Sequence, residues 1–147
     1  MNHEQTRETV ARIVAYFEQL RPEKLHELDA IYTQNATFKD PFNEVDGLTA
    51  IRKVYAHMFL SLHDPRFVVT GNVIQGQDCF LTWEFMFRFQ RFNTRTVQTI
   101  RGCSHLRLAD DGRIRHHRDY WDAAEELYEK LPVVGALMRW LKRRATT

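Results

Sequence analysis

The chain has 147 residues, of which 44% are hydrophobic and 27% are charged, an ordinary composition for one globular domain. Its net charge is only +2 and its basic residues are spread along the chain, so we expect no nucleic-acid binding. The two cysteines have no metal-binding spacing, no apolar run approaches the ~18 residues of a membrane-spanning helix, and the polar N-terminus does not resemble a signal peptide. We therefore expect a cytoplasmic protein, a single domain over residues 1–147, with no metal and no cofactor.

The first half of the chain has mainly helical periodicity. Apolar residues at spacings of three and four predict helices over residues 4–20, 22–32 and 47–62. Pro22 suits the first turn of the second helix, and Asp46 is the expected N-terminal cap of the third. A short strand is expected at 36–39, ending at Asp40 and Pro41.

The second half changes to the two-residue period of strands. We expect strands over residues 66–75, 78–91, 95–109 and 113–121. The second of these has the clearest alternation, with aromatic residues at Trp83, Phe85, Phe87 and Phe89. Residues 123–147 form a C-terminal extension, in which helices at about 122–131 and 133–144 are separated by Pro132.

This order of elements favours an α+β fold. Three N-terminal helices would cover one face of a curved antiparallel β-sheet, and the C-terminal helical tail would be an addition to that unit. A strongly curved sheet closed by helices makes a cone with an internal cavity. The aromatic strand favours the core or a dimer interface over a cofactor site.

Two stretches carry a family resemblance. Residues 32–42 read Tyr-Thr-Gln-Asn-Ala-Thr-Phe-Lys-Asp-Pro-Phe, and a Gly-Leu-Thr-Ala-Ile-Arg helix start follows at Gly47. This pattern resembles the ketosteroid isomerase and nuclear transport factor 2-like superfamily, which includes the SnoaL-like polyketide cyclases. The resemblance covers about residues 8–121, and it implies a pocket for acid/base chemistry on an apolar substrate.

The resemblance also implies catalytic roles. Asp40 falls at the general-base position and Tyr16 at the position that donates a hydrogen bond to the oxyanion. Ser104 falls where the isomerase has a protonated aspartic acid, and a serine is the weaker donor. Asp119 matches an aspartate near the end of the last strand that acts in acid/base chemistry in SnoaL-type cyclases, with His117 as its partner.

Further pocket residues follow from the same match. His117, Asp119 and Trp121 share one face of the last strand with Arg115, and the match turns that face into the cavity. We count Trp121, Tyr55 and Phe17 as substrate-binding residues together with Ser104 and His117.

Each candidate also has a purely structural interpretation. Asp40 before Pro41 is typical of a turn, and a tyrosine on an apolar stripe, such as Tyr16, is usually a core residue. Asp119 can form an ion pair with Arg115 or Arg118. Both interpretations stay open for each residue on sequence alone.

The leading hypothesis is an isomerase- or cyclase-like enzyme that moves a proton next to a carbonyl of a small apolar molecule. The alternative is a non-catalytic ligand- or partner-binding module, and epoxide hydrolysis ranks lowest. We expect a homodimer through the outer face of the sheet. The basic amphipathic helix near the C-terminus is expected to close the cone or pack on a neighbouring subunit rather than contact a membrane.

Overall fold

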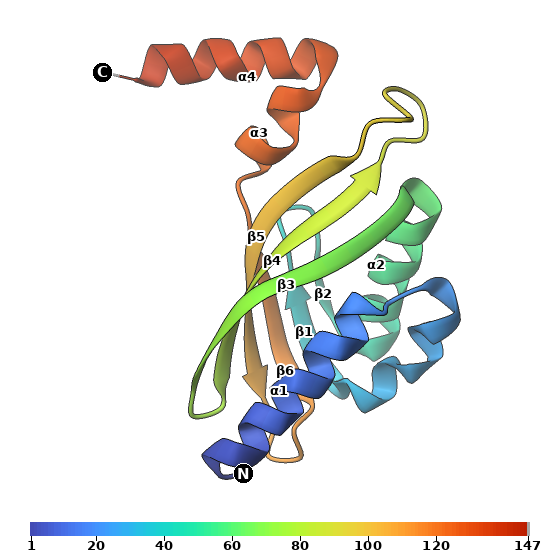
Figure 1. Cartoon of the computed structure of the whole chain (residues 1–147), viewed down its shortest axis with the longest axis vertical. Helices are drawn as coiled ribbons and strands as arrows, with labels where there is room; N and C mark the ends of the chain where they lie inside the picture. Colours follow the sequence, from blue (N-terminus) through green and yellow to red (C-terminus); the bar gives the residue numbers. More distant parts are fainter. Residues whose placement is uncertain (147) are drawn as a thin grey trace.

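In the computed structural model, which describes residues 1–146, helices pack against a curved six-stranded sheet of order β2-β1-β6-β5-β4-β3 (Figure 1). The helices are α1 (His3–Glu18), η1 (Pro22–Ala30), α2 (Leu48–Ser61), α3 (Ala123–Glu126), η2 (Tyr128–Lys130) and α4 (Pro132–Ala145), of which η1 and η2 are 3₁₀ helices. The strands are β1 (Tyr32–Lys39), β2 (Glu44–Asp46), β3 (His63–Gln75), β4 (Asp78–Arg88), β5 (Gln98–Leu108) and β6 (Ile114–Tyr120). The predicted α+β class is confirmed, and the order of elements agrees with the prediction except for the short strand β2, which was not predicted, and the division of the helix over 122–131.

The sheet is mixed, which corrects the expectation of a wholly antiparallel sheet. β1 pairs in parallel with β6, and the remaining neighbours pair antiparallel. After β1 and β2, the chain crosses through α2 to the far edge of the sheet and returns by three antiparallel steps from β3 to β6. That path brings β6 back beside β1 in the same direction.

Local structure at the start of α2 also differs from the prediction. Asp46 belongs to the short strand β2, and Gly47 occupies the N-cap position with φ +91° and no side-chain cap. Its N–H donates to the carbonyl of Ala36 at 2.7 Å, which ties the start of the helix to β1. The positive φ explains why a glycine stands there.

At the other end of the sheet, the predicted helix over 122–131 is two short pieces, α3 and η2. Asp122 caps the first piece, because its carboxylate accepts from the N–H of Glu125 at 3.1 Å. α4 then stands apart from the sheet at one end of the molecule (Figure 1). Within residues 1–146, no helix is long and apolar enough to cross a membrane.

The core lies between the inner face of the sheet and the helices. Phe17 of α1, Ile51 of α2, Leu81 of β4 and Leu106 of β5 are among its buried residues. The predicted alternation of β4 is also observed, since Trp83, Phe85 and Phe87 are buried and belong to this core.

A close approach between β5 and β4 makes room for one of these aromatic rings. Gly102 pairs with Trp83 across the two strands, and a Cβ on Gly102 would lie 2.3 Å from the indole ring. Only a residue without a side chain therefore leaves Trp83 in its place.

We predict that Gly102→Ala lowers the free energy of unfolding by about 2 kcal/mol, because the added methyl group overpacks the indole ring. Urea denaturation of the variant and the wild type measures this. Gly71→Ala on β3 is the matched control, since its Cβ would meet only the side-chain oxygen of Thr82, at 3.2 Å. Equal stability losses in both variants would contradict a specific requirement for glycine beside Trp83.

Candidate functional site

A chain of hydrogen bonds runs through the core to Asp119. The hydroxyl oxygens of Tyr55 and Tyr32 lie 2.8 Å apart, and Tyr32 Oη lies 2.6 Å from His117 Nδ1. The other ring nitrogen of His117, Nε2, lies 2.6 Å from Asp119 Oδ1. Tyr32, Tyr55 and His117 are all buried, so this polar chain is shielded from water along most of its length.

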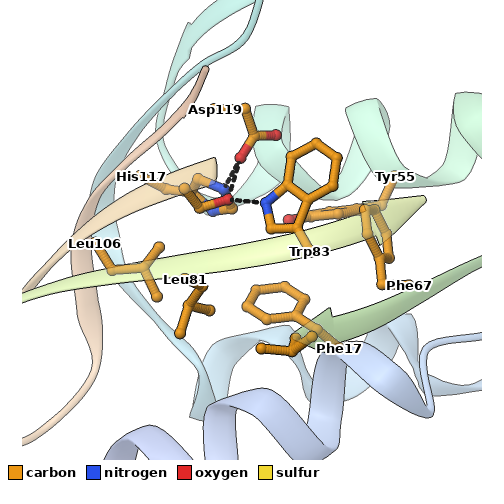
Figure 2. Close-up of a pocket in the computed structure, with 10 residues that line it drawn as sticks. Phe17, Tyr55, Phe67, Leu81, Trp83, Leu106, His117 and Asp119 are labelled. Carbon is orange, nitrogen blue, oxygen red and sulfur yellow. Dashed lines mark hydrogen bonds and ion pairs between the residues drawn. The ribbon is translucent and has the colours of Figure 1, made fainter. Parts of the chain in front are cut away.

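A second branch reaches the same carboxylate oxygen through Ser104. The indole N–H of Trp83 donates to Ser104 Oγ at 2.8 Å, and the Ser104 hydroxyl donates to Asp119 Oδ1 at 2.5 Å. Since an indole nitrogen can only donate, the Ser104 oxygen accepts from Trp83 and its single proton goes to Asp119. Figure 2 shows Trp83, His117 and Asp119 converging in this way.

Strand register explains the convergence. Ser104 of β5 stands directly opposite Asp119 of β6, and His117 lies two residues before Asp119 on the same face. The parallel pairing of β1 with β6 places Phe38 beside His117, with their ring centroids 4.8 Å apart. The ring of Tyr32 lies nearly parallel to the same imidazole, with their centroids 5.9 Å apart, so two aromatic rings contact His117.

A cavity of about 330 Å³ opens beside this network. α2, the inner faces of β4 and β5, the loop after β1 and the segment after β6 form its walls. Its lining residues are Phe38, Asp40, Phe42, Asn43, Val54, Tyr55, His57, Met58, Ser61, Leu62, Phe67, Trp83, Phe85, Phe87, Phe89, Ile100, Asp119, Trp121 and Leu127. A smaller space of about 30 Å³ lies deeper, and Phe17, Ser104 and His117 contribute to its wall (Figure 2).

The two tyrosines of the network remain protonated at neutral pH. Burial is the main cause that raises the pKa of Tyr32 and of Tyr55 well above the ordinary value, and the charge of Asp119 raises both further. Both residues are therefore neutral phenols that can donate hydrogen bonds. Tyr55 lines both cavities, and its hydroxyl belongs to the network, so this residue connects the two.

Asp40 lines the larger cavity, and its carboxylate is engaged in a turn. Oδ1 accepts from the N–H of Phe42 at 2.8 Å and from the N–H of Asn43 at 2.6 Å. The side-chain amide of Asn43 adds bonds of 3.1 and 3.2 Å to the two carboxylate oxygens. The turn interpretation thus applies, although the residue also lies at the cavity wall.

Tyr16 does not have the geometry of an oxyanion donor. Its hydroxyl donates to the backbone carbonyl of Lys24 at 2.7 Å, and it is not among the residues that line either cavity. Burial, followed by the charge of Glu27, raises its pKa to about 12. The single proton of Tyr16 thus links α1 to η1 rather than reaching the pocket.

The remaining candidates, apart from Arg115, lie at the walls of the two cavities. Phe17, Tyr55, Ser104, His117 and Trp121 all line one or both cavities. Arg115, expected on the same face, is exposed.

Sequence analysis missed two kinds of site residue. Trp83, Phe85, Phe87 and Phe89 line the larger cavity, although their alternation was interpreted as core or dimer interface. Tyr32 was quoted only as the first residue of a motif, and the signal that could have found it was the placement of that motif beside the last strand. Among the described residues, no group of three or more His, Cys, Asp or Glu side chains is arranged to hold a metal ion.

Comparison with known families agrees with the fold. The model of the SnoaL-like domain family matches residues 13–117. The chain belongs to the SnoaL-like family. This match covers His117 and ends two residues before Asp119. No curated protein matches the chain.

Solved structures with the same fold include a putative SnoaL-like polyketide cyclase from Jannaschia sp. CCS1, 16% identical, with a TM-score of 0.70 over 83% of this chain and 88% of that one. A hypothetical protein from Catenulispora acidiphila with a ketosteroid isomerase-like fold, in complex with trimethylamine, is also 16% identical, with a TM-score of 0.68 over 82% and 89%. TsrD from Streptomyces laurentii is 14% identical, with a TM-score of 0.69 over 92% and 98%. At these identities the similarity establishes the fold alone.

For the SnoaL-like chain described here, Tyr16→Phe should leave ligand binding and any turnover unchanged. It should lower the free energy of unfolding by about 1 kcal/mol, because the hydrogen bond to the Lys24 carbonyl is lost. Chemical denaturation and ligand titration of the variant separate the two effects. A large loss of turnover at wild-type stability would restore the oxyanion role of Tyr16.

Proposed function

We propose that this SnoaL-like protein binds a small apolar molecule in the larger cavity and moves a proton next to a carbonyl group of that molecule. Asp119 is the acid/base group in this proposal. The observation that carries it is the position of Asp119, which ends a buried hydrogen-bond network and lines the cavity. General acid/base catalysis needs a carboxylate held in one orientation within reach of the substrate.

The two donors to Asp119 explain how its orientation is fixed. His117 and Ser104 both bind Oδ1. In the part of the chain that the structure describes, Oδ2 of Asp119 has no hydrogen-bond partner. One oxygen thus anchors the side chain, and the other is available for a proton from a ligand.

The hydrogen bonds of the two carboxylates favour Asp119 over Asp40 as the base. Oδ1 of Asp40 is occupied by two backbone N–H groups, and Oδ2 is bonded to the amide of Asn43. A proton transfer at Asp40 would compete with these bonds, whereas Oδ2 of Asp119 has no bond to break. We therefore assign Asp40 to shaping the cavity wall.

Tyr55 is the proposed donor to the carbonyl oxygen. If His117 carries a proton on both ring nitrogens, Nδ1–H donates to Tyr32, Tyr32 donates to Tyr55, and the Tyr55 proton is left for the cavity. If His117 carries its single proton on Nε2, it still donates to Asp119 and the tyrosine chain runs the other way, from Tyr55 to Tyr32 to Nδ1. A positively charged His117 would thus direct a donor at the developing oxyanion through two hydroxyl groups.

The nature of the walls supports an apolar substrate. Trp83, Phe85, Phe87 and Phe89 contribute aromatic surface, and a cavity of about 330 Å³ is in the usual size range for small-molecule sites. The description of the Jannaschia structure as a putative polyketide cyclase supports the cyclase class. The proposal needs no cofactor.

A non-catalytic ligand-binding module is the second candidate. It is favoured by the engagement of both implied oxyanion donors, since the proton of Tyr16 goes to Lys24 and that of Ser104 goes to Asp119. Epoxide hydrolysis stays last, because Arg101, the arginine considered for it, forms a 2.7 Å ion pair with Glu126.

We also retain a homodimer through the outer face of the sheet as a proposal. Val68, Val73 and Phe80 are exposed apolar residues of β3 and β4, and Val73 and Phe80 stand opposite each other in the ladder. Exposed apolar surface of this kind suits a subunit contact.

We predict that Asp119→Asn lowers kcat by about 10²- to 10⁴-fold, the usual contribution of a general acid or base. A thermal-shift screen with steroid enones, planar phenols, aromatic polyketide-like ketones and epoxides first identifies a ligand, and steady-state kinetics on that ligand then measure turnover. Asp40→Asn is the matched control and should retain most of the activity. Full activity of Asp119→Asn together with inactive Asp40→Asn would reverse the assignment.

Tyr55→Phe should lower kcat by about 10²-fold while changing the dissociation constant of a neutral ligand little, because the lost hydrogen bond matters mainly when negative charge develops. Measuring kcat by steady-state kinetics and the ligand affinity by calorimetry distinguishes a loss of transition-state stabilisation from unfolding, which would reduce both. Equal losses in affinity and in kcat would instead indicate a role in ground-state binding.

A further inference from the structure

The apolar residues of α4 are exposed to solvent. Val133 and Leu137 are 82% and 52% exposed, and Val134, Trp140 and Leu141 are also exposed. These positions follow one another at helical spacing, so they form one side of the helix, here called the apolar face of α4. No α4 residue lines either of the two cavities described above, so in this chain the helix does not close the cone.

The polar side of α4 is the side that holds the helix to the body. The Arg139 guanidinium donates to the backbone carbonyl of Glu129 at 2.6 Å, and the Lys142 ammonium lies 3.6 Å from the Glu129 carboxylate. Gly135 is buried at the same contact, where an added Cβ would lie 2.4 Å from the Glu129 carbonyl oxygen. This close approach fixes which side of α4 meets η2, and it turns the apolar face outward.

The orientation of α4 is the reverse of that of a helix that packs on its own domain. A surface helix normally buries its apolar stripe and exposes its charges. Here, part of the charge is used for docking to η2, and the apolar stripe is left uncovered at the end of the molecule where α4 stands apart (Figure 1).

A cation stacks on the apolar face. The guanidinium of Arg144 lies 5.1 Å from the ring centroid of Trp140. Among residues 1–146, Arg144 forms no ion pair with an acidic side chain. Tryptophan and arginine together are typical of helices that lie in the boundary between lipid headgroups and acyl chains.

We propose that α4 binds an anionic lipid surface through its apolar face. The apolar side chains would enter the headgroup region, and Arg144 would meet the negative charge of the lipid phosphates. The sequence alone favoured a helix that closes the cone or packs on a neighbouring subunit. The docking of the polar side through Gly135 and Arg139 now favours a lipid surface, because it leaves the apolar face exposed.

Co-sedimentation of the full-length protein with vesicles tests this proposal. One vesicle type is phosphatidylcholine alone, and the other is phosphatidylcholine mixed with phosphatidylglycerol. We expect binding to the anionic vesicles and much weaker binding to the neutral ones. Arg144→Gln should weaken binding to the anionic vesicles about fivefold, since one basic residue near such a surface contributes about 1 kcal/mol.

A pair of variants separates the face of α4 from general surface hydrophobicity. Trp140→Ser should abolish most of the binding, whereas Leu60→Ser should not, because Leu60 is 77% exposed on α2 and lies outside the proposed surface. Circular dichroism checks that both variants fold.

Three results would overturn the proposal: no sedimentation with anionic vesicles, sedimentation that Trp140→Ser leaves unchanged, or an equal loss in both variants. Light scattering identifies the competing occupant. A dimer that Trp140→Ser dissociates, from a protein that does not bind vesicles, would assign the apolar face to a second copy of the chain.

Discussion

One carboxylate oxygen organises the interior of this protein. Oδ1 of Asp119 accepts from Ser104 and from His117, and through them it is connected to Trp83 on one side and to Tyr32 and Tyr55 on the other. Each of these groups is polar and lies in or near the core, where an unpaired hydrogen-bonding group costs about 1–3 kcal/mol. The network leaves none of the described buried side-chain nitrogen and oxygen atoms without a partner.

This constraint also fixes the sheet. Asp119 reaches Ser104 in the observed register of β5 and β6, and a slip of β6 by one residue would turn Asp119 to the outer face while Ser104 stayed on the inner one. The parallel entry of β1 beside β6 then places Tyr32 near His117. The mixed topology, which the strand pattern alone did not indicate, is therefore a precondition for the network.

The fold could largely be predicted from the sequence because the periodic patterns are strong and local. The helix at α1 and the alternation of β4 required no knowledge of the rest of the chain. The site was harder, since it depends on contacts between distant segments. The resemblance placed Tyr16 at an oxyanion position, but its hydroxyl donates to the carbonyl of Lys24 in η1, a contact that only the folded structure reveals. Asp119 and His117 were found because they share a strand face, whereas Tyr32 joins them from the other end of the chain.

The turn at Asp40 has a structural role that does not depend on proton transfer. Its bonds to the Phe42 and Asn43 N–H groups hold the loop after β1 in place, and that loop presents Phe42 to Trp121 and Tyr128, at ring-centroid distances of 5.6 and 6.2 Å. Trp121 lines the cavity, and Tyr128 belongs to η2, the element that α4 contacts. The turn thus connects the cavity wall to the base of the C-terminal helix. The hydrogen bonds of this turn are sufficient to explain an aspartate at this position.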